Sequence, residues 1–267
     1  ENRILQEKKQ TWYIKKYNSY SNNIKKYYKE LFKFIKKRDL KIITLGKTSN
    51  EKILLINSKR INKKNKNILI AGSFHGDEPA GSWGILEYII KSKKTIFNKI
   101  NISFVPIVNP IGFKNGNSRN LENRNPNRHF TDKSLIKLST EGKILKRNIK
   151  LIKYLAKDGF LTLHEDYGQK KFYIYSFEKT RGPGLFSKCM LESGGKVFGK
   201  AKSGIIDGCL IKEGIIFKEY DGSFEDYLFR LGVPITICSE TPRKKSIDLR
   251  IKASEEIIKE FIKLNLN

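Results

Sequence analysis

The sequence predicts an α/β fold, in which helices flank a mixed, mostly parallel central sheet within a single domain. Three observations support this prediction. Short apolar runs typical of buried strands alternate along the chain with segments of helical periodicity. Neither an internal repeat nor a linker divides the 267 residues. Hydrophobic residues make up 39% of the chain, which is enough for a core in a domain of this length.

Residues 1–40 are predicted to form a basic, aromatic, helical extension that packs on the rest of the domain. Between residues 8 and 38 apolar side chains recur at steps of three and four, which predicts one amphipathic helix or a helix pair. The apolar face consists of Ile24, Tyr27, Leu31 and Ile35. We expect this stripe to pack in the core rather than to meet a membrane or a partner.

The patterning then changes from helical to strand-like. Residues 41–45 and 52–56 are short β-rich runs separated by Gly46 and polar residues, which predicts a hairpin. Residues 67–72 have the apolar character of a buried strand. A helix is expected from Pro79 to Lys91, since proline suits the first turn of a helix.

The remaining segments continue the alternation. Strands are predicted at residues 102–108, 160–163, 172–175 and 233–238, and helices at residues 133–156, 184–198, 223–231 and 246–264. Between them, residues 109–131 are rich in Asn, Gly, Pro and Arg and predict a long loop. Loops of this length are usually either functional or disordered.

The chain is strongly basic, with 54 Lys and Arg against 27 Asp and Glu, a net charge of +27. Lysines spread through every segment, which is typical of the compositional bias of chains encoded by AT-rich genomes. A surface selected for polyanions is the alternative, and either origin gives a field that attracts anionic substrates. We therefore expect an anionic peptide or acyl-amino acid as the partner, and we consider nucleic acid a poorer fit.

No apolar run approaches the roughly 18 residues of a membrane span, so no membrane partner is expected. The three cysteines, Cys189, Cys209 and Cys238, form no CxxC pair, which excludes a disulfide framework or a cysteine-based zinc ribbon. Free thiols and an N-terminal region without an apolar signal core favour the cytoplasm. Because the chain starts at Glu1, a removed signal peptide and a periplasmic location remain an alternative.

Two of the three histidines follow predicted strands. His75 and Glu78 come just after the strand that ends at residue 72, and His164 follows the strand at 160–163. Open α/β sheets place their sites at the carboxyl ends of strands. Imidazole nitrogens and carboxylate oxygens are good zinc ligands, and a catalytic zinc takes three protein ligands. Each residue alone would fit a structural role, but their joint placement favours a metal site.

The long loop holds three arginines in a chain whose cations are mostly lysine, namely Arg119, Arg124 and Arg128. Arginine binds carboxylates through paired hydrogen bonds and stabilises oxyanions, so this cluster predicts an anion-binding function. Glu240 is placed after the predicted strand 233–238. An acid there either faces solvent, forms a salt bridge, or serves as the base that takes a proton from a metal-activated water.

Together these residues resemble the zinc carboxypeptidases of the carboxypeptidase A superfamily, which includes bacterial murein peptide amidases, succinylglutamate desuccinylases and aspartoacylase. The motifs occur in the family order: His75-Gly76-Asp77-Glu78, Asn109-Pro110-Ile111-Gly112, Arg119, Asn127-Arg128, His164, Gly222-Ser223 and Glu240. An ordered set of this kind is far more specific than any one member. The resemblance implies a zinc carboxypeptidase-like fold, with residues 1–267 as one catalytic domain.

The resemblance implies a role for each acid and histidine. His75, Glu78 and His164 would bind Zn²⁺, one ion per chain, and Glu240 would act first as the general base and then as the proton donor. The family often has an acid that accepts a hydrogen bond from the first zinc histidine, and here Asn125 stands at that position. An amide adds no charge, so we expect His75 to be a weaker ligand unless Asp77 or another acid substitutes.

The resemblance also implies roles for the residues of the long loop. Arg119 would stabilise the oxyanion of the tetrahedral intermediate. Asn127 and Arg128 would hold the carboxylate of the terminal residue of the substrate. The tyrosine that covers the substrate in the digestive enzymes has no secure counterpart, and Tyr220 is considered for that place.

Three functions follow, and we predict the first. It is a zinc metallocarboxypeptidase that hydrolyses a peptide bond near a free carboxylate, such as that of a peptidoglycan stem peptide, and the Asn127-Arg128 pair favours it. The second is a zinc-dependent deacylase of N-acyl amino acids, similar to the desuccinylases and aspartoacylase, which commonly carry a further β-domain after the catalytic one. The third is a basic nucleic-acid-binding module on a decayed enzyme fold, which would bind duplexes in a salt-sensitive way without stoichiometric zinc.

Overall fold

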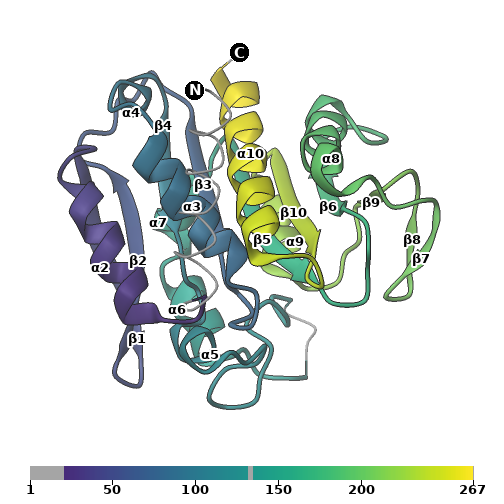
Figure 1. The fold of residues 1–267 in the computed structure, drawn as a ribbon, viewed down its shortest axis with the longest axis horizontal. Helices are drawn as coiled ribbons and strands as arrows, with labels where there is room; N and C mark the ends of the chain where they lie inside the picture. The colour runs from purple at the N-terminus through teal and green to yellow at the C-terminus, as the bar shows by residue number, and fades with distance from the viewer. Residues whose placement is uncertain (1–20, 132–134, 267) are drawn as a thin grey trace, which may run out of the picture.

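The computed structural model describes residues 21–131 and 135–266, and a mixed β-sheet of eight strands forms its centre (Figure 1). The strands are ordered β1-β2-β4-β3-β5-β10-β6-β9. Their bounds are β1 Leu40–Thr48, β2 Glu51–Ser58, β3 Asn67–Gly72, β4 Asn101–Val105, β5 Gly159–Asp166, β6 Tyr173–Glu178, β9 Ile215–Phe217 and β10 Ile235–Pro242. Two short strands, β7 (Gly204–Ile206) and β8 (Cys209–Ile211), pair separately.

Four neighbouring strands in the middle of the sheet run parallel to one another. β4 pairs with β3, β3 with β5, and β5 with β10, all in parallel register. The β1–β2 hairpin joins β4 in antiparallel register, and β6 joins β10 in the same way on the other side. The mixed, mostly parallel sheet expected from the sequence is therefore confirmed, and so is its antiparallel hairpin.

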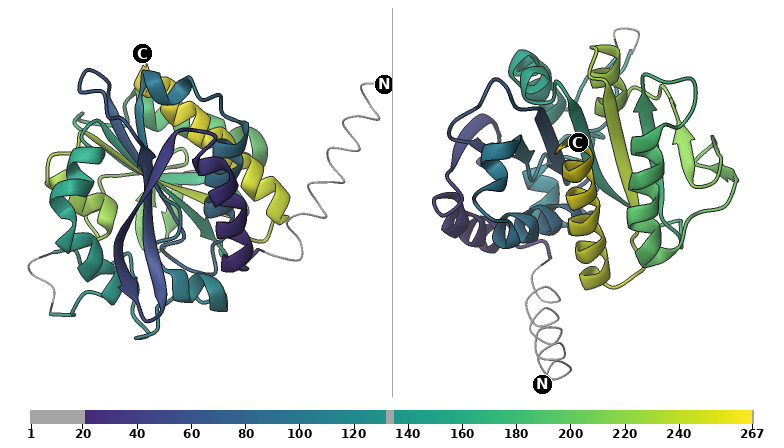
Figure 2. Two further views of the ribbon diagram at one scale, coloured as in Figure 1. Left: turned by 90° about the vertical axis from the view of Figure 1, so that its left-hand side faces the viewer. Right: turned by 90° about the horizontal axis from the view of Figure 1, so that it is seen from above.

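Helices cover both faces of the sheet (Figure 2). One layer consists of α2 (Ile24–Ile35), α3 (Ala80–Lys91), α8 (Leu185–Phe198) and α10 (Ile247–Leu266). The opposite layer consists of α6 (Thr140–Arg147), α7 (Ile149–Leu155) and α9 (Phe224–Arg230). Two short helices, α4 (Ile96–Lys99) and α5 (Pro110–Asn115), lie in connections. None of the helices in the described ranges is long and apolar enough to cross a lipid bilayer.

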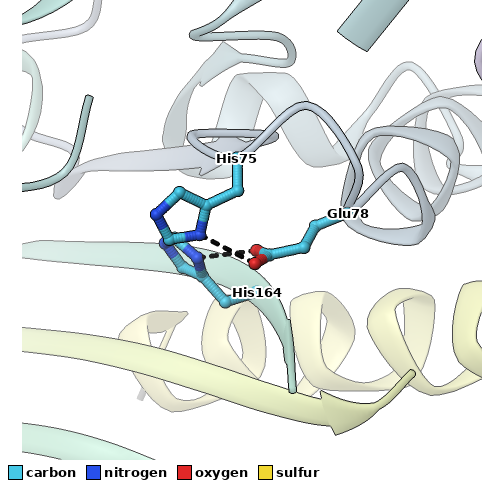
Figure 3. A group of neighbouring side chains, drawn as sticks. All are labelled: His75, Glu78 and His164. Atoms are coloured by element: carbon cyan, nitrogen blue, oxygen red, sulfur yellow. Dashed lines mark hydrogen bonds and ion pairs between the residues drawn. The ribbon is translucent and has the colours of Figure 1, made fainter. Parts of the chain in front are cut away.

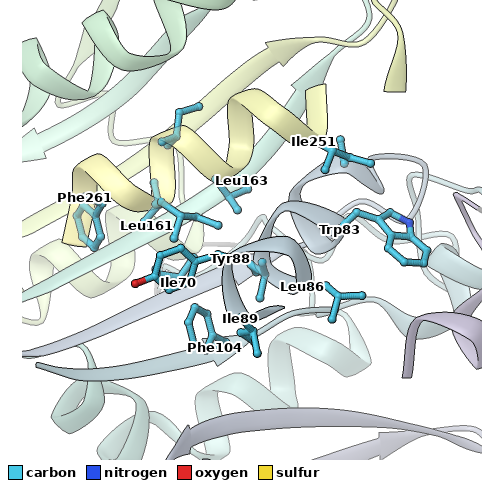
Figure 4. Packing of buried hydrophobic residues seen from close by; sticks show 14 of the residues in the cluster. Ile70, Trp83, Leu86, Tyr88, Ile89, Phe104, Leu161, Leu163, Ile251 and Phe261 are labelled. Atoms are coloured by element: carbon cyan, nitrogen blue, oxygen red, sulfur yellow. The ribbon is translucent and has the colours of Figure 1, made fainter. Parts of the chain in front are cut away.

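Alternation along the buried strands divides the core into two layers. In β3, Ile68 and Ile70 pack with the residues of α3 and α10, whereas Leu69 and Ala71 pack with those of α6 and α7. Figure 4 shows the first layer, with Ile70 of the sheet facing Tyr88 of α3. Both faces are covered, so β3 is buried at every position, which explains its continuous apolar run.

The described part of the N-terminal region is helical, as predicted. Helix α2 begins after Asn23, whose side chain accepts a hydrogen bond from the N–H of Lys26 and so caps the helix. Its buried residues are the predicted stripe Ile24, Tyr27, Leu31 and Ile35. The Tyr27 hydroxyl donates to the carbonyl oxygen of Ser82 in α3 at 2.9 Å, which fixes α2 on that layer. Residues 8–20 of the predicted helix lie outside the described residues.

Several predicted elements differ in extent from those observed. The strand predicted at 102–108 ends at Val105, because Pro106 has no N–H to continue the ladder. The helix predicted at 133–156 consists of two helices, α6 and α7. β5 continues to Asp166 and the last strand continues to Pro242, so His164 and Glu240 lie inside their strands rather than after them.

Within the long loop predicted over 109–131, residues Pro110–Asn115 form helix α5. The side chain of Asn109 accepts a hydrogen bond from the N–H of Gly112, and Pro110 occupies the first turn. Gly116 ends the helix in the left-handed conformation, with φ of 66°. The Asn-Pro-x-Gly motif is therefore a helix start that turns the chain at the end of β4.

Candidate metal centre

A stripe of polar side chains crosses two neighbouring strands on the face covered by α9. In β5 the leucines on either side of Thr162 pack toward α3 and α10, so alternation turns Thr162 and His164 to the opposite face. In β10 the same alternation turns Cys238 and Glu240 to that face. The parallel register pairs Thr162 with Cys238 and His164 with Glu240. The two strands therefore place an imidazole and a carboxylate side by side.

The turn between β3 and α3 carries the first two predicted ligands. It passes so close to α5 that a Cβ on Gly76 would lie 1.8 Å from the carbonyl carbon of Gly112, and glycine alone fits there. The side-chain amide of Asn22 donates to the carbonyl oxygens of Gly76, at 2.9 Å, and Phe113, at 2.7 Å. These contacts fix the backbone from which the two ligands project.

The three predicted metal ligands converge (Figure 3). Nδ1 of His75 lies 2.7 Å from Oε1 of Glu78, and Nδ1 of His164 lies 2.8 Å from Oε2 of the same carboxylate. One ligand atom of each residue lies within 4.8 Å of the other two. His164 and Glu78 are buried, and His75 is half-buried. The sheet order thus brings together residues from two segments that are far apart in the sequence.

The hydrogen bonds around His75 show that these side chains need a positive charge among them, either a cation or a proton. The Asn125 amide oxygen accepts from the N–H of Asn127 at 2.8 Å, which fixes it as an acceptor. Nε2 of His75 lies 3.0 Å from the same oxygen and so must carry a proton. In the neutral ring, the lone pair of Nδ1 then faces the Glu78 carboxylate. Two electron-rich atoms this close need a cation or a proton between them.

The electrostatics of the cluster agree with this requirement. Burial by itself raises the pKa of Glu78, but the charges and hydrogen bonds of the two histidines outweigh burial and lower that pKa to about 2. Burial lowers the pKa of His75 and of His164, yet Glu78 outweighs it and raises both. Without a metal, protons on the rings supply the positive charge. The donor set of two imidazoles and one carboxylate fits a catalytic zinc site.

Glu240 lines the same cavity as the three ligands. Burial raises the pKa of its carboxyl to about 8; the charge of His164 opposes this shift, and the charges of Glu78 and Asp166 add to it. The Cys238 thiol donates a hydrogen bond to Oε1 of Glu240 at 3.5 Å. A carboxyl group with a pKa near neutrality can both accept and return a proton, as the predicted role requires.

The partner of His75 is the one expected from the sequence. Asn125 accepts the hydrogen bond from Nε2 of His75, so the first histidine has a neutral partner. Asp77 does not substitute for an acid at this position, because its carboxylate pairs with the guanidinium of Arg243. The alternative in which Asp77 supports His75 is therefore wrong.

Arg128 and Asn127 are placed differently from one another. Arg128 lines the cavity, with its guanidinium 3.2 Å from the carboxylate of Asp221. Asn127 also borders the cavity, but its amide is engaged on both sides. Its Oδ1 accepts from the N–H of Phe224 at 2.9 Å, and its Nδ2 donates to Glu225 at 3.0 Å. Arg128 is thus the better placed of the two to receive a substrate carboxylate.

Arg119 lies at the rim of the site rather than inside it. Its side chain is exposed and donates to the carbonyl oxygen of Asn123 at 3.2 Å. The neighbouring Ser118 lines the cavity, but Arg119 does not, so the structure does not bring the predicted oxyanion residue to the ligands. Tyr220 is also outside the lining, 57% exposed and packed against Phe177.

The cavity has a volume of about 310 Å³ and is much more acidic than the chain as a whole. Besides Glu78 and Glu240, its lining includes the acids Asp166, Asp207, Glu219, Asp221 and Glu225, whereas its arginines are Arg128 and Arg243. The net charge of +27 is therefore a property of the outer surface. Attraction of an anionic group within the cavity depends on the two arginines.

Sequence reasoning missed Glu225, Arg243 and the two tyrosines Tyr173 and Tyr175, all of which line the cavity. A signal for Glu225 was present, because the Gly222-Ser223 motif precedes its helix. Ser223 caps α9 and places Glu225 in the first turn. The other residues carry no local signal, since β6 and β10 meet only through the order of the sheet.

Comparison with known proteins agrees with this geometry. Residues 64–166 match the family model of the succinylglutamate desuccinylase/aspartoacylase catalytic domain. That segment runs from β3 to the end of β5 and contains all three converging ligands. A search of curated proteins found no match to this chain.

Solved structures resemble the whole described fold. A "putative metallopeptidase" from Shewanella denitrificans is 38% identical, with a TM-score of 0.86 over 91% of this chain and 90% of that one. A second, from Shewanella amazonensis, is 34% identical, with a TM-score of 0.88 over 91% and 94%. A metallo-carboxypeptidase from Burkholderia cenocepacia is 15% identical, with a TM-score of 0.65 over 87% and 66%, and shares the fold.

Proposed function

Because this chain belongs to the zinc carboxypeptidase-like superfamily, we propose that it is a zinc-dependent hydrolase that cleaves a peptide bond beside a free carboxylate. Membership of this superfamily makes it a metal-dependent hydrolase; zinc, the peptide and the carboxylate are the proposed refinements. The observation that carries the zinc-dependent hydrolysis is that His75, Glu78 and His164 offer a three-ligand site, and Glu240 faces it from the neighbouring strand.

In this proposal His75, Glu78 and His164 would hold a zinc ion, which would supply the Lewis acidity that polarises a carbonyl and acidifies a water. Glu240 would take a proton from the attacking water and return it to the leaving amine. Its position on β10 supports this role, because the register places it beside His164. In the metal-free protein burial raises the pKa of its carboxyl to about 8, and the charge of a bound zinc ion would lower it, so the group would titrate near neutrality, as proton transfer in both directions needs.

Arg128 holds the substrate carboxylate in the proposal. Its guanidinium lies in the cavity and forms an ion pair with Asp221 at 3.2 Å, so a bidentate carboxylate of the substrate would compete with that contact. Arg119 takes the oxyanion role after it leaves its contact with Asn123 and turns inward from the rim. Rotation of an exposed side chain is fast, and the adjacent Ser118 already borders the cavity.

The acidity of the cavity bears on the substrate class. Two lining arginines, Arg128 and Arg243, face a larger number of carboxylates, and Arg243 is already paired with Asp77. A substrate with one carboxylate next to the scissile bond suits this balance better than an acyl-amino acid that carries several. We therefore favour a peptide with a single free carboxylate. A peptidoglycan stem peptide, which carries several carboxylates, is the contrasting substrate in the test.

A zinc-dependent deacylase of N-acyl amino acids is the second candidate. The observation in its favour is the match of residues 64–166 to the desuccinylase/aspartoacylase catalytic domain. The same ligands and the same base would serve both reactions, since each hydrolyses an amide next to a carboxylate. The two functions differ in what lies on the acyl side of the bond.

A substrate panel on the zinc-loaded protein tests the proposal. It contains murein tripeptides, ordinary peptides with free C-termini, the same peptides with amidated C-termini, and N-acyl amino acids. We expect hydrolysis of peptides with free carboxylates, and none with the Glu240→Gln variant. Hydrolysis confined to the N-acyl amino acids would replace the peptidase proposal by the deacylase. Absence of stoichiometric metal in the purified, reconstituted protein would exclude both.

A further inference from the structure

We infer that Glu225 is the positioning residue that strengthens His164 as a metal ligand, supplying the negative charge that Asn125 does not give to His75. The inference deepens the proposed function and rests on it, since it assumes that His164 binds a metal. It concerns the two outer ring nitrogens of the histidines, which point away from Glu78. One of them faces a neutral amide and the other faces a buried carboxylate.

Glu225 is a buried charge that needs an explanation. Its side chain, in the first turn of α9, is 1% exposed. Its nearest ionisable partner in the described residues is His164, whose Nε2 lies 3.8 Å from Oε1 of Glu225, and the guanidinium of Arg128 interacts with it electrostatically from farther away. Burying a carboxylate costs several kcal/mol unless positive charge or hydrogen bonds compensate. A positive charge on the other side of the imidazole ring would provide that compensation.

Neighbouring side chains hold the carboxylate in place against the ring. The Thr162 hydroxyl donates to Oε1, and the Asn127 amide donates to Oε2 at 3.0 Å. The amide cannot turn round, because its oxygen accepts from the N–H of Phe224 at 2.9 Å. Thr162 lies two residues before His164 on the same face of β5, so the hydroxyl and the ring share one rigid strand. Glu225 is therefore fixed with one oxygen toward Nε2.

The two histidines thus have unequal surroundings. Both direct Nδ1 toward Glu78. The outer nitrogen of His75 donates to the amide oxygen of Asn125 at 3.0 Å, a neutral partner. The outer nitrogen of His164 lies beside the charge of Glu225. A carboxylate beside the outer nitrogen raises the basicity of the ring, so the chain provides on His164 the support that it lacks on His75.

The same region could be taken for a second metal site, because ligand atoms of His164, Glu225 and Cys238 lie within 4.8 Å of one another. The hydrogen bonds argue against this. Nδ2 of Asn127 is fixed as a donor and lies 3.0 Å from Glu225 and 3.4 Å from Nε2 of His164. Its partial positive charge would repel a second cation. A supporting role for Glu225 agrees with all of these contacts.

Affinity for Zn²⁺, measured by competition with a chelator, tests the inference without any substrate. Glu225→Gln keeps the size of the side chain but removes the charge, and its amide offers one acceptor oxygen where the carboxylate offers two. Loss of a supporting group of this kind typically weakens metal binding by about 10- to 100-fold, and we expect a loss in that range. Asp226→Asn is the matched control: Asp226 is equally buried on α9 but pairs with Arg230, so its loss is expected to change Zn²⁺ affinity less than about threefold.

Moving the charge gives a more specific test. Asn125→Asp places a carboxylate beside His75, and in the Glu225→Gln background it should recover most of the lost Zn²⁺ affinity. A purely structural role for Glu225 would not respond to a charge added on the other histidine. Metal-free melting temperatures of all variants show that they fold. If Glu225→Gln does not fold, Glu225→Asp replaces it: it withdraws the charge by one methylene, and a loss of about threefold to tenfold is expected.

The outcomes separate this inference from the proposed function. If the wild type binds one Zn²⁺ and Glu225→Gln binds it as tightly as Asp226→Asn, the inference is overturned while the proposed function stands. If Asn125→Asp does not restore the Zn²⁺ affinity of the Glu225→Gln protein, then charge is not what Glu225 contributes, and the inference is again overturned. If the wild type binds no Zn²⁺, the proposed function fails with it.

Discussion

His164 and Glu240 are register partners on the adjacent parallel strands β5 and β10, and both project to the face that α9 covers. A histidine of the metal cluster and a carboxyl group with a raised pKa are thereby placed next to each other by the backbone of the sheet. A site built on strands is held more rigidly than one built on loops. Mutations of the residues on these strands are therefore expected to act differently from mutations of the site residues on loops.

Glu240→Gln is expected to abolish turnover and leave the metal bound. The amide cannot take a proton from water, and loss of a general base typically lowers kcat by about 10²- to 10⁴-fold. Zn²⁺ stoichiometry, measured by elemental analysis, should stay at that of the wild type. Glu256→Gln, on the exposed side of α10, is the control and should keep full activity. A fully active Glu240→Gln protein would remove Glu240 from the mechanism.

Arg128→Ala is expected to raise KM for peptides with a free C-terminus. A hydrogen bond to a charged group contributes about 1.5 to 3 kcal/mol, so kcat/KM should fall by about tenfold to a hundredfold. The same peptides with amidated C-termini offer no carboxylate and should be cleaved equally by both proteins. An equal fall for free and amidated peptides would show that Arg128 does not bind the carboxylate.

Arg119→Ala separates the rim position of this residue from its proposed role. If the guanidinium turns inward to meet the oxyanion, its loss should lower kcat by about 10²- to 10³-fold and change KM little. Steady-state kinetics with the preferred peptide measure both parameters. Arg124→Ala, which removes another arginine of the same loop, is the comparison. If the two variants are equally active, Arg119 stays at the rim during the reaction.

The stability of the metal-free protein should depend on pH through Glu240. Its folded-state pKa is about 8, against 4.5 for the free side chain, so the folded state binds the extra proton between these values. The stabilisation from the protonated form is therefore complete below pH 4.5 and is lost as pH rises to 8. Glu240→Gln removes this loss, so its melting temperature in chelator should rise relative to the wild type from pH 5 to pH 8.5. If the difference in melting temperature between the two proteins stayed constant across that pH range, the raised pKa of Glu240 would be contradicted.

Gly76→Ala is expected to destabilise the fold and weaken metal binding together. The added Cβ would lie 1.8 Å from the backbone of Gly112, so the turn that carries His75 must move away from α5. Overpacking of this kind costs about 1 to 3 kcal/mol of unfolding free energy, measured by urea denaturation. Gly204→Ala is the matched control, because its Cβ would meet nothing within 4 Å. A Gly76→Ala protein with unchanged Zn²⁺ affinity would show that the turn need not be held by this contact.

Much of the fold could be predicted because local patterns determine it. The apolar stripe of α2, the continuous apolar run of β3 and the proline start of α3 are each visible within a dozen residues. The predictions were wrong at element ends, as at Pro106, where one missing N–H decides the boundary. The short strands β7, β8 and β9, of three residues each, have too little pattern to predict.

The sequence by itself determined which side chains are offered to the site: two histidines and a glutamate at strand ends, and an acid on the last strand. The tertiary structure decided what surrounds them. Glu225 lies beside His164, and the Asn127 amide donates a hydrogen bond to Glu225. Arg119 lies at the rim, and acids line the cavity although the chain as a whole is basic. The physical reason is that alternation fixes the face of a residue locally, whereas its neighbours depend on strand order and register, which the packing of the whole chain sets.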